Sequence, residues 1–191
     1  MKAPQWLRFC VFSSTPVRLP LRHVRTGTVC NRRSGPSIDN HRGVLVPQTA
    51  STVERITFHG HPMVRSLHPT TIEITTEERL TEKGDCIVGV GAAKGCSQLR
   101  ETLKTALRSE KAKVKIRVLV GNESFELTAE GDKGLELSHP HDIVIRRSRF
   151  VSGRTLAVGA SAAAKDIPRS IVSKLKNAET VGALEIEVHG A

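Results

Sequence analysis

An internal repeat constrains this 191-residue chain more than any other feature of its sequence. The stretch "HPTTIEITTEERLTEKGDCIVGVGA" begins at His68, and "HPHDIVIRRSRFVSGRTLAVGA" begins at His139. Each passes from a His-Pro pair through alternating Ile residues to a Gly that precedes an apolar run. Matching positions recur with offsets of 68 to 71 residues: Gly60, His68, Gly84, Gly91, Leu107 and Val114 against Gly131, His139, Gly153, Gly159, Leu175 and Leu184. We infer an internal duplication, with units over about residues 53–120 and 124–190.

The apolar pattern predicts the same strands in both units. Alternation predicts a strand at the start, the middle and the end of each: residues 56–58, 72–74 and 114–120, then residues 125–129, 143–145 and 184–188. A short strand before each His-Pro pair ("MVRSL" and "GLEL") and an apolar run after Gly84 and Gly153 complete the unit. Pro has no N–H to donate and restricts the residue before it, so each His-Pro pair is expected to end a strand. The total is about ten strands.

Helical spacing of apolar residues occurs once in each unit. The first set is Leu99, Leu103, Ala106 and Leu107, and the second is Ile167, Ile171, Val172 and Leu175. Ser97 and Asp166 stand just before these runs and are the expected N-caps. Each unit should therefore contain one short amphipathic helix.

Together these patterns predict a mainly β domain with two short helices (α+β) over residues 51–191. Neither half has enough apolar surface to stand alone, so we expect the halves to share one core about a pseudo-twofold axis, as a closed barrel or a sandwich. The closing strands carry Lys in the first unit and Glu in the second. Opposite charges favour cross-strand neighbours, so residues 113–120 and 183–189 are expected to pair in one sheet.

The positive charge of the chain is concentrated near its N-terminus. The net charge is +10, but residues 1–42 hold eight of the 29 basic residues and one of the 19 acidic ones, which leaves residues 43–191 at +3. An Arg-rich, acid-poor segment without a long apolar run is typical of a mitochondrial presequence. We predict such a leader over residues 1–50; the alternatives are an untargeted tail on a cytoplasmic protein and a mis-assigned start codon. No apolar run approaches the roughly 18 residues of a membrane span.

Four ordered motifs carry a resemblance to a known family: "GHPMVRSLHPTTIEIT", "LTEKGDCIVGV", "LSHPHDIVIRRS" and "SGRTLAVGA". From about Val53 to Val188 the chain resembles the archaeal family called domain of unknown function 371. The resemblance implies a mainly β domain and no assigned activity. The leader has no counterpart there, which favours an organellar version of the domain. The matching residues are Gly60, His61, Pro62, His68, Thr71, Gly84, Asp85, His139, Pro140, Asp142, Arg146, Gly153, Arg154 and Thr155.

Two departures from the family's usual text concern the turn after residue 146 and the Gly-rich segment "GVGAAKG". Arg149 stands where an acid is expected, which weakens any shared role for the turn over residues 146–149.

Histidines are the first candidates for a site. His59, His61 and His68 could form an asymmetric metal set, because alternate residues of a strand share a face. The repeat argues against it, since His59 and His61 match Glu130 and Asp132 in the second unit. The four cysteines form no CxxC pair, so neither a zinc ribbon nor a disulfide scaffold is predicted.

The matched histidines support a different hypothesis. If the pseudo-twofold axis brings the two His-Pro corners together, His68 and His139 could act as acid and base beside Asp85 and Asp142. The alternative is that each imidazole hydrogen-bonds a loose backbone carbonyl at a strand end and each Asp caps a turn.

A cationic cluster gives the second candidate site. The "RRSRF" turn brings Arg146, Arg147 and Arg149 close in sequence to Arg154. With Thr71 and Thr155, two hydroxyl residues of the family motifs, Arg146, Arg147 and Arg154 could hold the phosphates of RNA or of a small anion. A solvated loop is the alternative.

We therefore expect a binding module for RNA or a small anionic ligand. The alternative function is a small enzyme that acts on an anionic metabolite through the His68 and His139 corners. Convergence of the two corners in one pocket would favour the enzyme. The sequence indicates no cofactor and no oligomeric state.

Overall fold

The computed structural model describes residues 51–81, 84–110 and 112–189, so the predicted leader, residues 1–50, lies outside them. In chain order the elements are β1 (Thr52–His59), β2 (Thr71–Thr75), β3 (Ile87–Gly89), the 3₁₀ turn η1 (Cys96–Gln98), α1 (Glu101–Leu107), β4 (Lys113–Val120), β5 (Glu123–Glu130), β6 (Asp142–Arg146), β7 (Thr155–Ala157), η2 (Ala164–Asp166), α2 (Arg169–Leu175) and β8 (Val181–His189). No helix of this part of the chain is long and apolar enough to span a membrane.

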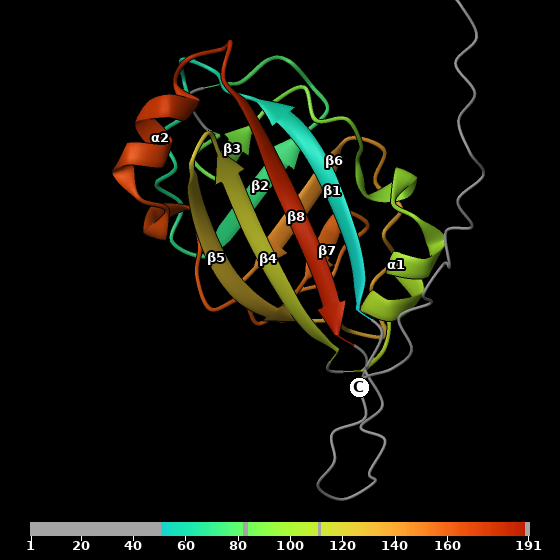
Figure 1. The fold of residues 1–191 in the computed structure, drawn as a ribbon. Coiled ribbons are helices and arrows are strands. Elements are labelled where there is room, and N and C mark those ends of the chain that lie inside the picture. The colour runs from blue at the N-terminus through green and yellow to red at the C-terminus, as the bar shows by residue number, and fades with distance from the viewer. Residues whose placement is uncertain (1–50, 82–83, 111, 190–191) are drawn as a thin grey trace, which may run out of the picture. The chain divides into compact units, whose positions relative to one another are not determined.

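The strands form two four-stranded sheets (Figure 1). Sheet A has the order β1-β8-β4-β5, and all its neighbours are antiparallel. Sheet B has the order β3-β2-β6-β7, with an antiparallel central pair and a parallel strand on either side. In Figure 1 sheet A lies in front, its strands cross those of sheet B behind, and α1 and α2 flank the sheets on opposite sides.

One continuous apolar core joins both sheets and both helices. Alternation along the strands turns Ile56 and Phe58 of β1 into this core from sheet A, and Ile72 and Ile74 of β2 from sheet B. All four are at most 1% exposed, and burial of each such side chain stabilises the fold by about 1.5–3 kcal/mol. The predicted mainly β class with two helices is confirmed.

The pairing expected from opposite charges is also confirmed. β4 and β8 are antiparallel neighbours, with Lys115 opposite Glu187 and Arg117 opposite Glu185. The Arg117 guanidinium forms ion pairs with both glutamates, which are 19% exposed at the side chain. These pairs lie on the face of sheet A that points away from the core, as the interleaved sequence requires.

The predicted closed barrel is wrong. In the described residues, the two sheets are joined only by isolated bridges, His59 to Val90 and Glu130 to Val158. Each bridge follows directly after β3 or β7, which are three residues long. Strands this short cannot extend a ladder along the edge strands β1 and β5, so the sheets stay separate.

Eight strands form in the described residues, fewer than the ten or so predicted. The segments "MVRSL" (residues 63–67) and "GLEL" (residues 134–137) are irregular. Ser66 and Leu137 each have φ of 52°, in the left-handed region, which interrupts an extended strand. The N–H of Leu67 donates instead to the carbonyl of Asp85 at 3.1 Å, so this segment is tied to a loop.

The predicted helix starts are displaced. Ser97 and Asp166 fall in η1 and η2, and two residues with non-helical dihedral angles separate each 3₁₀ turn from the helix that follows. Neither α1 nor α2 receives a side-chain N-cap. Asp166 accepts the N–H of Ala163 at 2.9 Å, so it caps η2 rather than α2.

The ring of Phe58 fills the space left by two glycines, one in each sheet. A Cβ added to Gly89 of β3 would overlap this ring, and one added to Gly182 of β8 would lie 2.6 Å from its Cε2 atom. A glycine within a strand marks a place where another group approaches closely. The buried ring therefore fixes how β1 of sheet A meets β3 of sheet B.

Gly89→Ala should destabilise the fold, because the added methyl group overlaps Phe58. Overpacking typically costs about 1–3 kcal/mol, and we expect a loss of at least about 2 kcal/mol in the free energy of unfolding by urea. Gly134→Ala is the control, since Gly134 lies in an exposed turn; it should change stability by less than about 0.5 kcal/mol. Gly89→Ala combined with Phe58→Leu should cost less than the sum of the single changes. Additive costs would contradict the contact.

Candidate functional site

The outer face of sheet B carries polar side chains that are nevertheless buried. Because Ile72 and Ile74 of β2 point into the core, the alternate residues point the other way. Thr71, Glu73 and Thr75 are 8%, 6% and 2% exposed. With the outward residues of β6 and β7 they form what we call the polar face of sheet B: Thr71, Glu73, Thr75, Asp142, Arg146 and Thr155.

An ionic network covers the middle of the polar face. The Nη1 atom of Arg154 lies 3.3 Å from Glu73 Oε1 and 3.3 Å from Asp142 Oδ2. The Sγ atom of Cys86 donates to Glu73 Oε2 at 3.3 Å. Asp142 is also 3.6 Å from Nδ1 of His139. Arg154 thus joins β2, β6 and the start of β7 through two carboxylates.

Glu73 is the acid of this network that lies deepest in the protein. Burial raises the pKa of Glu73 above its ordinary value of 4.5; the Arg154 guanidinium and the Cys86 hydrogen bond act in the opposite direction but do not cancel the effect. Across the β2–β6 pair, Glu73 faces Val144, which is apolar. Glu73 therefore depends on Arg154 for its compensating charge.

Arg146 differs from Arg154 because no carboxylate lies within ion-pair distance of it among the described residues, although the charge of Glu73 acts on it from further away. Its Nε atom donates to Thr155 Oγ1 at 3.2 Å, and its guanidinium lies over the Phe150 ring, 5.1 Å from the centroid. Burial lowers the pKa of Arg146, and the neighbouring Arg154 lowers it further. Two guanidinium groups therefore share one face, and Thr71 stands directly opposite Arg146 in the strand pair.

The other arginines of the "RRSRF" turn point elsewhere. Arg147 donates to the Asp166 carboxylate at 2.7 Å and to the Ser161 carbonyl at 3.2 Å. Arg149 pairs with Glu130 at 2.5 Å. Of the predicted ligand-binding residues, the structure brings together Arg146, Arg154, Thr71 and Thr155, and it separates Arg147 from them.

The two His-Pro corners do not converge. His68 precedes β2 and His139 precedes β6, and these strands are antiparallel over five residues. The corners therefore lie at opposite ends of the strand pair, separated by roughly 17 Å of strand. Asp85 lies at the His68 end, where its carbonyl accepts the His68 N–H at 3.2 Å, while Asp142 lies at the His139 end. The predicted four-residue acid-base set is not assembled.

Both imidazoles instead close their own turns. Nδ1 of His68 accepts the N–H of Thr70 at 3.3 Å, and Nδ1 of His139 accepts the N–H of Asp142 at 2.9 Å. This resembles the alternative expected for these corners, except that the rings accept N–H groups and leave the carbonyls to other partners.

The asymmetric metal set is not assembled either. Within the described ranges, no group of three or more His, Cys, Asp or Glu side chains is placed to hold a metal ion. Nδ1 of His61 accepts the N–H of Met63 at 3.1 Å, so His61, like His68, serves a turn. The backbone of His59 pairs with that of Val90 in the isolated bridge between the two sheets.

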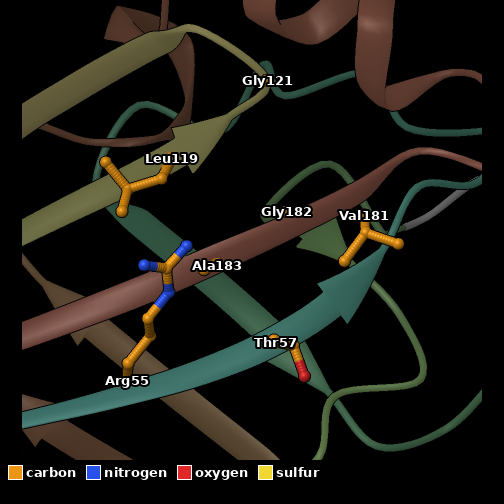
Figure 2. A pocket seen from close by; sticks show the side chains of 7 residues that line it. All are labelled: Arg55, Thr57, Leu119, Gly121, Val181, Gly182 and Ala183. Atoms are coloured by element: carbon orange, nitrogen blue, oxygen red, sulfur yellow. The ribbon is translucent and has the colours of Figure 1, made fainter. Parts of the chain in front are cut away.

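A shallow hollow on the outer face of sheet A is a second candidate (Figure 2). Its floor is Ala183, which lies between Thr57 and Leu119 in the sheet. Arg55 is the one charged side chain among the described residues that line it, and Val181 lies on the rim. A single charged group fixes a ligand poorly, so the polar face of sheet B is the stronger candidate.

Sequence reasoning missed Glu73, Cys86 and Phe150 as members of the site. A signal for Glu73 was present, because an acid stands between Ile72 and Ile74 where the second unit has Val144. Phe150 carried no such signal, since nothing local shows that its ring lies against Arg146.

Comparison with known proteins identifies relatives without a described activity. The sequence pattern of a family described as "Domain of unknown function (DUF371)" matches residues 56–189. Over 117 residues the chain is 44% identical to a protein of Methanocaldococcus jannaschii that is named as uncharacterized; the match covers 61% of this chain and 86% of the relative. That organism is an archaeon, and archaea have no mitochondria. The predicted mitochondrial localisation and the expected organellar version of the domain are therefore wrong.

Replacement of Glu73 by Gln should change how stability depends on pH. Because the pKa of Glu73 is raised in the folded protein, the folded state holds this proton at pH values where the unfolded chain has lost it, and the parent loses stability as pH rises above about 4.5. Gln lacks this titration, so the stability of Glu73→Gln relative to the parent should increase with pH between 4.5 and 8. Urea unfolding at several pH values measures the difference.

Glu101→Gln is the matched control, because Lys104 lowers the pKa of Glu101. Its stability relative to the parent should fall as pH rises through the range below about 4.5, the opposite sense, and should stay nearly constant between 4.5 and 8. A difference for Glu73→Gln that is flat or falls with pH would contradict the assignment.

Cys86 and Cys96 should react slowly with thiol reagents in the folded protein. Burial raises the pKa of each thiol to about 12, which leaves ~1,000-fold less thiolate than an ordinary cysteine near pH 8. In a variant with Cys10→Ser and Cys30→Ser, reaction with a chromogenic disulfide should be at least about 100-fold slower than after unfolding in guanidinium. Equal rates before and after unfolding would refute the burial of both thiols.

Proposed function

Because the chain belongs to the family described as domain of unknown function (DUF371), whose description assigns no activity, we propose its function from the polar face of sheet B. The protein is a binding module for a small anionic ligand. Arg146 and Arg154 supply the positive charge, and the hydroxyl groups of Thr71 and Thr155 line the same face.

The observation that carries this proposal is the state of Arg146. Its guanidinium is partly buried and has no carboxylate within ion-pair distance in the described residues, and its Nε atom donates to a hydroxyl. An arginine has five N–H donors in a planar fork that matches carboxylate and phosphate groups. Burial without a counter-ion costs free energy, so an anion that reached Arg146 would stabilise the face as well as bind to it.

A small ligand is favoured over RNA by the arginines that pair internally. Arg147 and Arg149 are held by Asp166 and Glu130, so they do not extend a row of free cations for successive phosphates. Asp142 and Glu73 already balance much of the charge of Arg154. The remaining positive charge suits one anionic group.

Acid-base catalysis by the His68 and His139 corners is not part of the proposal. The two rings lie at opposite ends of the β2–β6 pair, and each serves its own turn through Nδ1. A pair that shares one substrate atom needs both groups within hydrogen-bond reach of it.

We also propose that residues 51–191 are one duplicated domain with a pseudo-twofold axis through the β4–β8 and β2–β6 pairs. The strand orders β1-β8-β4-β5 and β3-β2-β6-β7 support it. The repeat makes β1 equivalent to β5, β4 to β8, β2 to β6 and β3 to β7. Exchanging the two members of every pair gives the same two orders read backwards, as a twofold axis requires. The left-handed residues recur at matching places, Ser66 with Leu137 and Gly91 with Gly159. Within this frame the polar face lies on sheet B, where Glu73 of the first unit matches Val144 of the second.

Titration of the full chain with inorganic phosphate and pyrophosphate tests the binding proposal. We expect saturable binding by calorimetry at low ionic strength, and a loss of about tenfold or more in affinity for Arg146→Gln, because a charge-assisted hydrogen bond is removed. Arg147→Gln is the matched control, since the neighbouring arginine pairs with Asp166 away from the polar face. Its affinity should stay within about twofold of the parent. Equal losses for both variants, or no saturable binding, would reject the proposal.

A further inference from the structure

Phe150 is the exposed phenylalanine of the described residues, and it lies beside the proposed anion site. Its side chain is 62% exposed, whereas Phe58 is fully buried and Phe125 packs against the core. The Arg146 guanidinium lies over the ring, 5.1 Å from the centroid. An exposed ring of this kind normally finds an apolar or aromatic partner when one is available.

The position of the ring is tied to the polar face through Arg146. The Nε atom of Arg146 donates to Thr155 Oγ1, which also accepts the N–H of Ser152 at 3.1 Å. The guanidinium is therefore anchored to β7 while its planar surface faces Phe150. A cation and an aromatic ring held at one separation can contact two different parts of the same ligand.

We propose that the anion site extends onto Phe150 and that its ligand is a phosphate ester of a planar aromatic group, of the class of a mononucleotide. This rests on the proposed function: the phosphate binds Arg146 and Arg154, and the planar group stacks on the exposed part of the Phe150 ring. In a mononucleotide one sugar joins the phosphate to the base, so the two groups are close enough to contact the Arg146 guanidinium and the neighbouring Phe150 ring together.

The same surface fits one base better than a strand of bases. Recognition of single-stranded nucleic acid uses several aromatic platforms along a groove of free cations. Among the described residues Phe150 is the one exposed phenylalanine, and Arg147 and Arg149 on either side of Ser148 are paired with acids. One platform beside one unpaired guanidinium provides for a single nucleotide.

The test compares AMP with ribose 5-phosphate, which lacks the base, by calorimetry on the full chain. A stacked base increases affinity by a factor of about 5 to 150, so AMP should bind the parent about tenfold more tightly or better. Phe150→Leu keeps an apolar side chain but removes the ring, and should bring AMP to the affinity of ribose 5-phosphate while the latter stays within about twofold. Val53→Ala, at an exposed apolar position on sheet A, should change neither.

Three outcomes would overturn the inference, and they separate it from the proposed function. Equal affinity of the parent for AMP and ribose 5-phosphate would reject base stacking on Phe150 but would leave the proposed anion binding supported. Absence of binding by both probes removes the anion site as well. A parent that sediments as a dimer, that becomes a monomer in Phe150→Leu and that binds AMP equally in both forms would show that the ring joins two copies of the chain.

Discussion

The packing of one aromatic ring against two glycines determines how the two sheets meet. Phe58 extends from β1 in sheet A to Gly89 in β3 of sheet B, and its ring also covers Gly182 of β8. Only residues without a Cβ leave room for it, so neither glycine can acquire a side chain without movement of a sheet. The core on the inner face of sheet B depends on this contact, and the position of β3 in turn places Cys86 beside Glu73 on the outer face.

Sheet B departs from the usual division of a sheet into an apolar face and a wet face. Its outer face buries Glu73 and holds it with Arg154, while Asp142 shares the same guanidinium. Removal of a charge from water is unfavourable unless a partner compensates for it, and Arg146 has no carboxylate within ion-pair distance in the described part of the chain. Two acids and two cations occupy the face, yet both acids contact the same cation. A bound anion would make the second pairing.

The strands could be predicted from the sequence because burial of one face imposes a period of two on residues such as Val114, Ile116 and Val118. The β4–β8 pairing could be predicted because the two strands carry side chains of opposite charge, such as Arg117 and Glu185, which favour cross-strand neighbours. Helix starts could not, since a side chain such as Asp166 caps a 3₁₀ turn by the same chemistry as an α-helix. The prediction of a closed barrel was wrong because β3 and β7 are too short to pair along the other sheet, and an apolar run in the sequence does not indicate where a strand ends.

The site was less accessible than the fold to sequence reasoning. Arg146 and Arg147 are neighbours of identical chemistry, and what distinguishes them is the face of β6 on which each side chain emerges and the loop that supplies Asp166. Glu73 gains its role from Arg154, 81 residues later in the chain. Local patterns carry no information on such a partner, because the contact exists only after the strands of both halves have paired.

The strand order of sheet A has a consequence for how the chain folds during synthesis. Within the described residues β1 forms a ladder with β8 alone, the last strand in the element order, and β4 lies between β8 and β5. Until the ribosome has released β8, the first strand has no ladder partner and β4 has one open edge. Pairings this far apart in sequence close slowly, and unpaired edges recruit other chains. A nascent chain of this protein therefore depends on completion of its C-terminus before its N-terminal strand is protected, and loss of β8 would expose two strands at once.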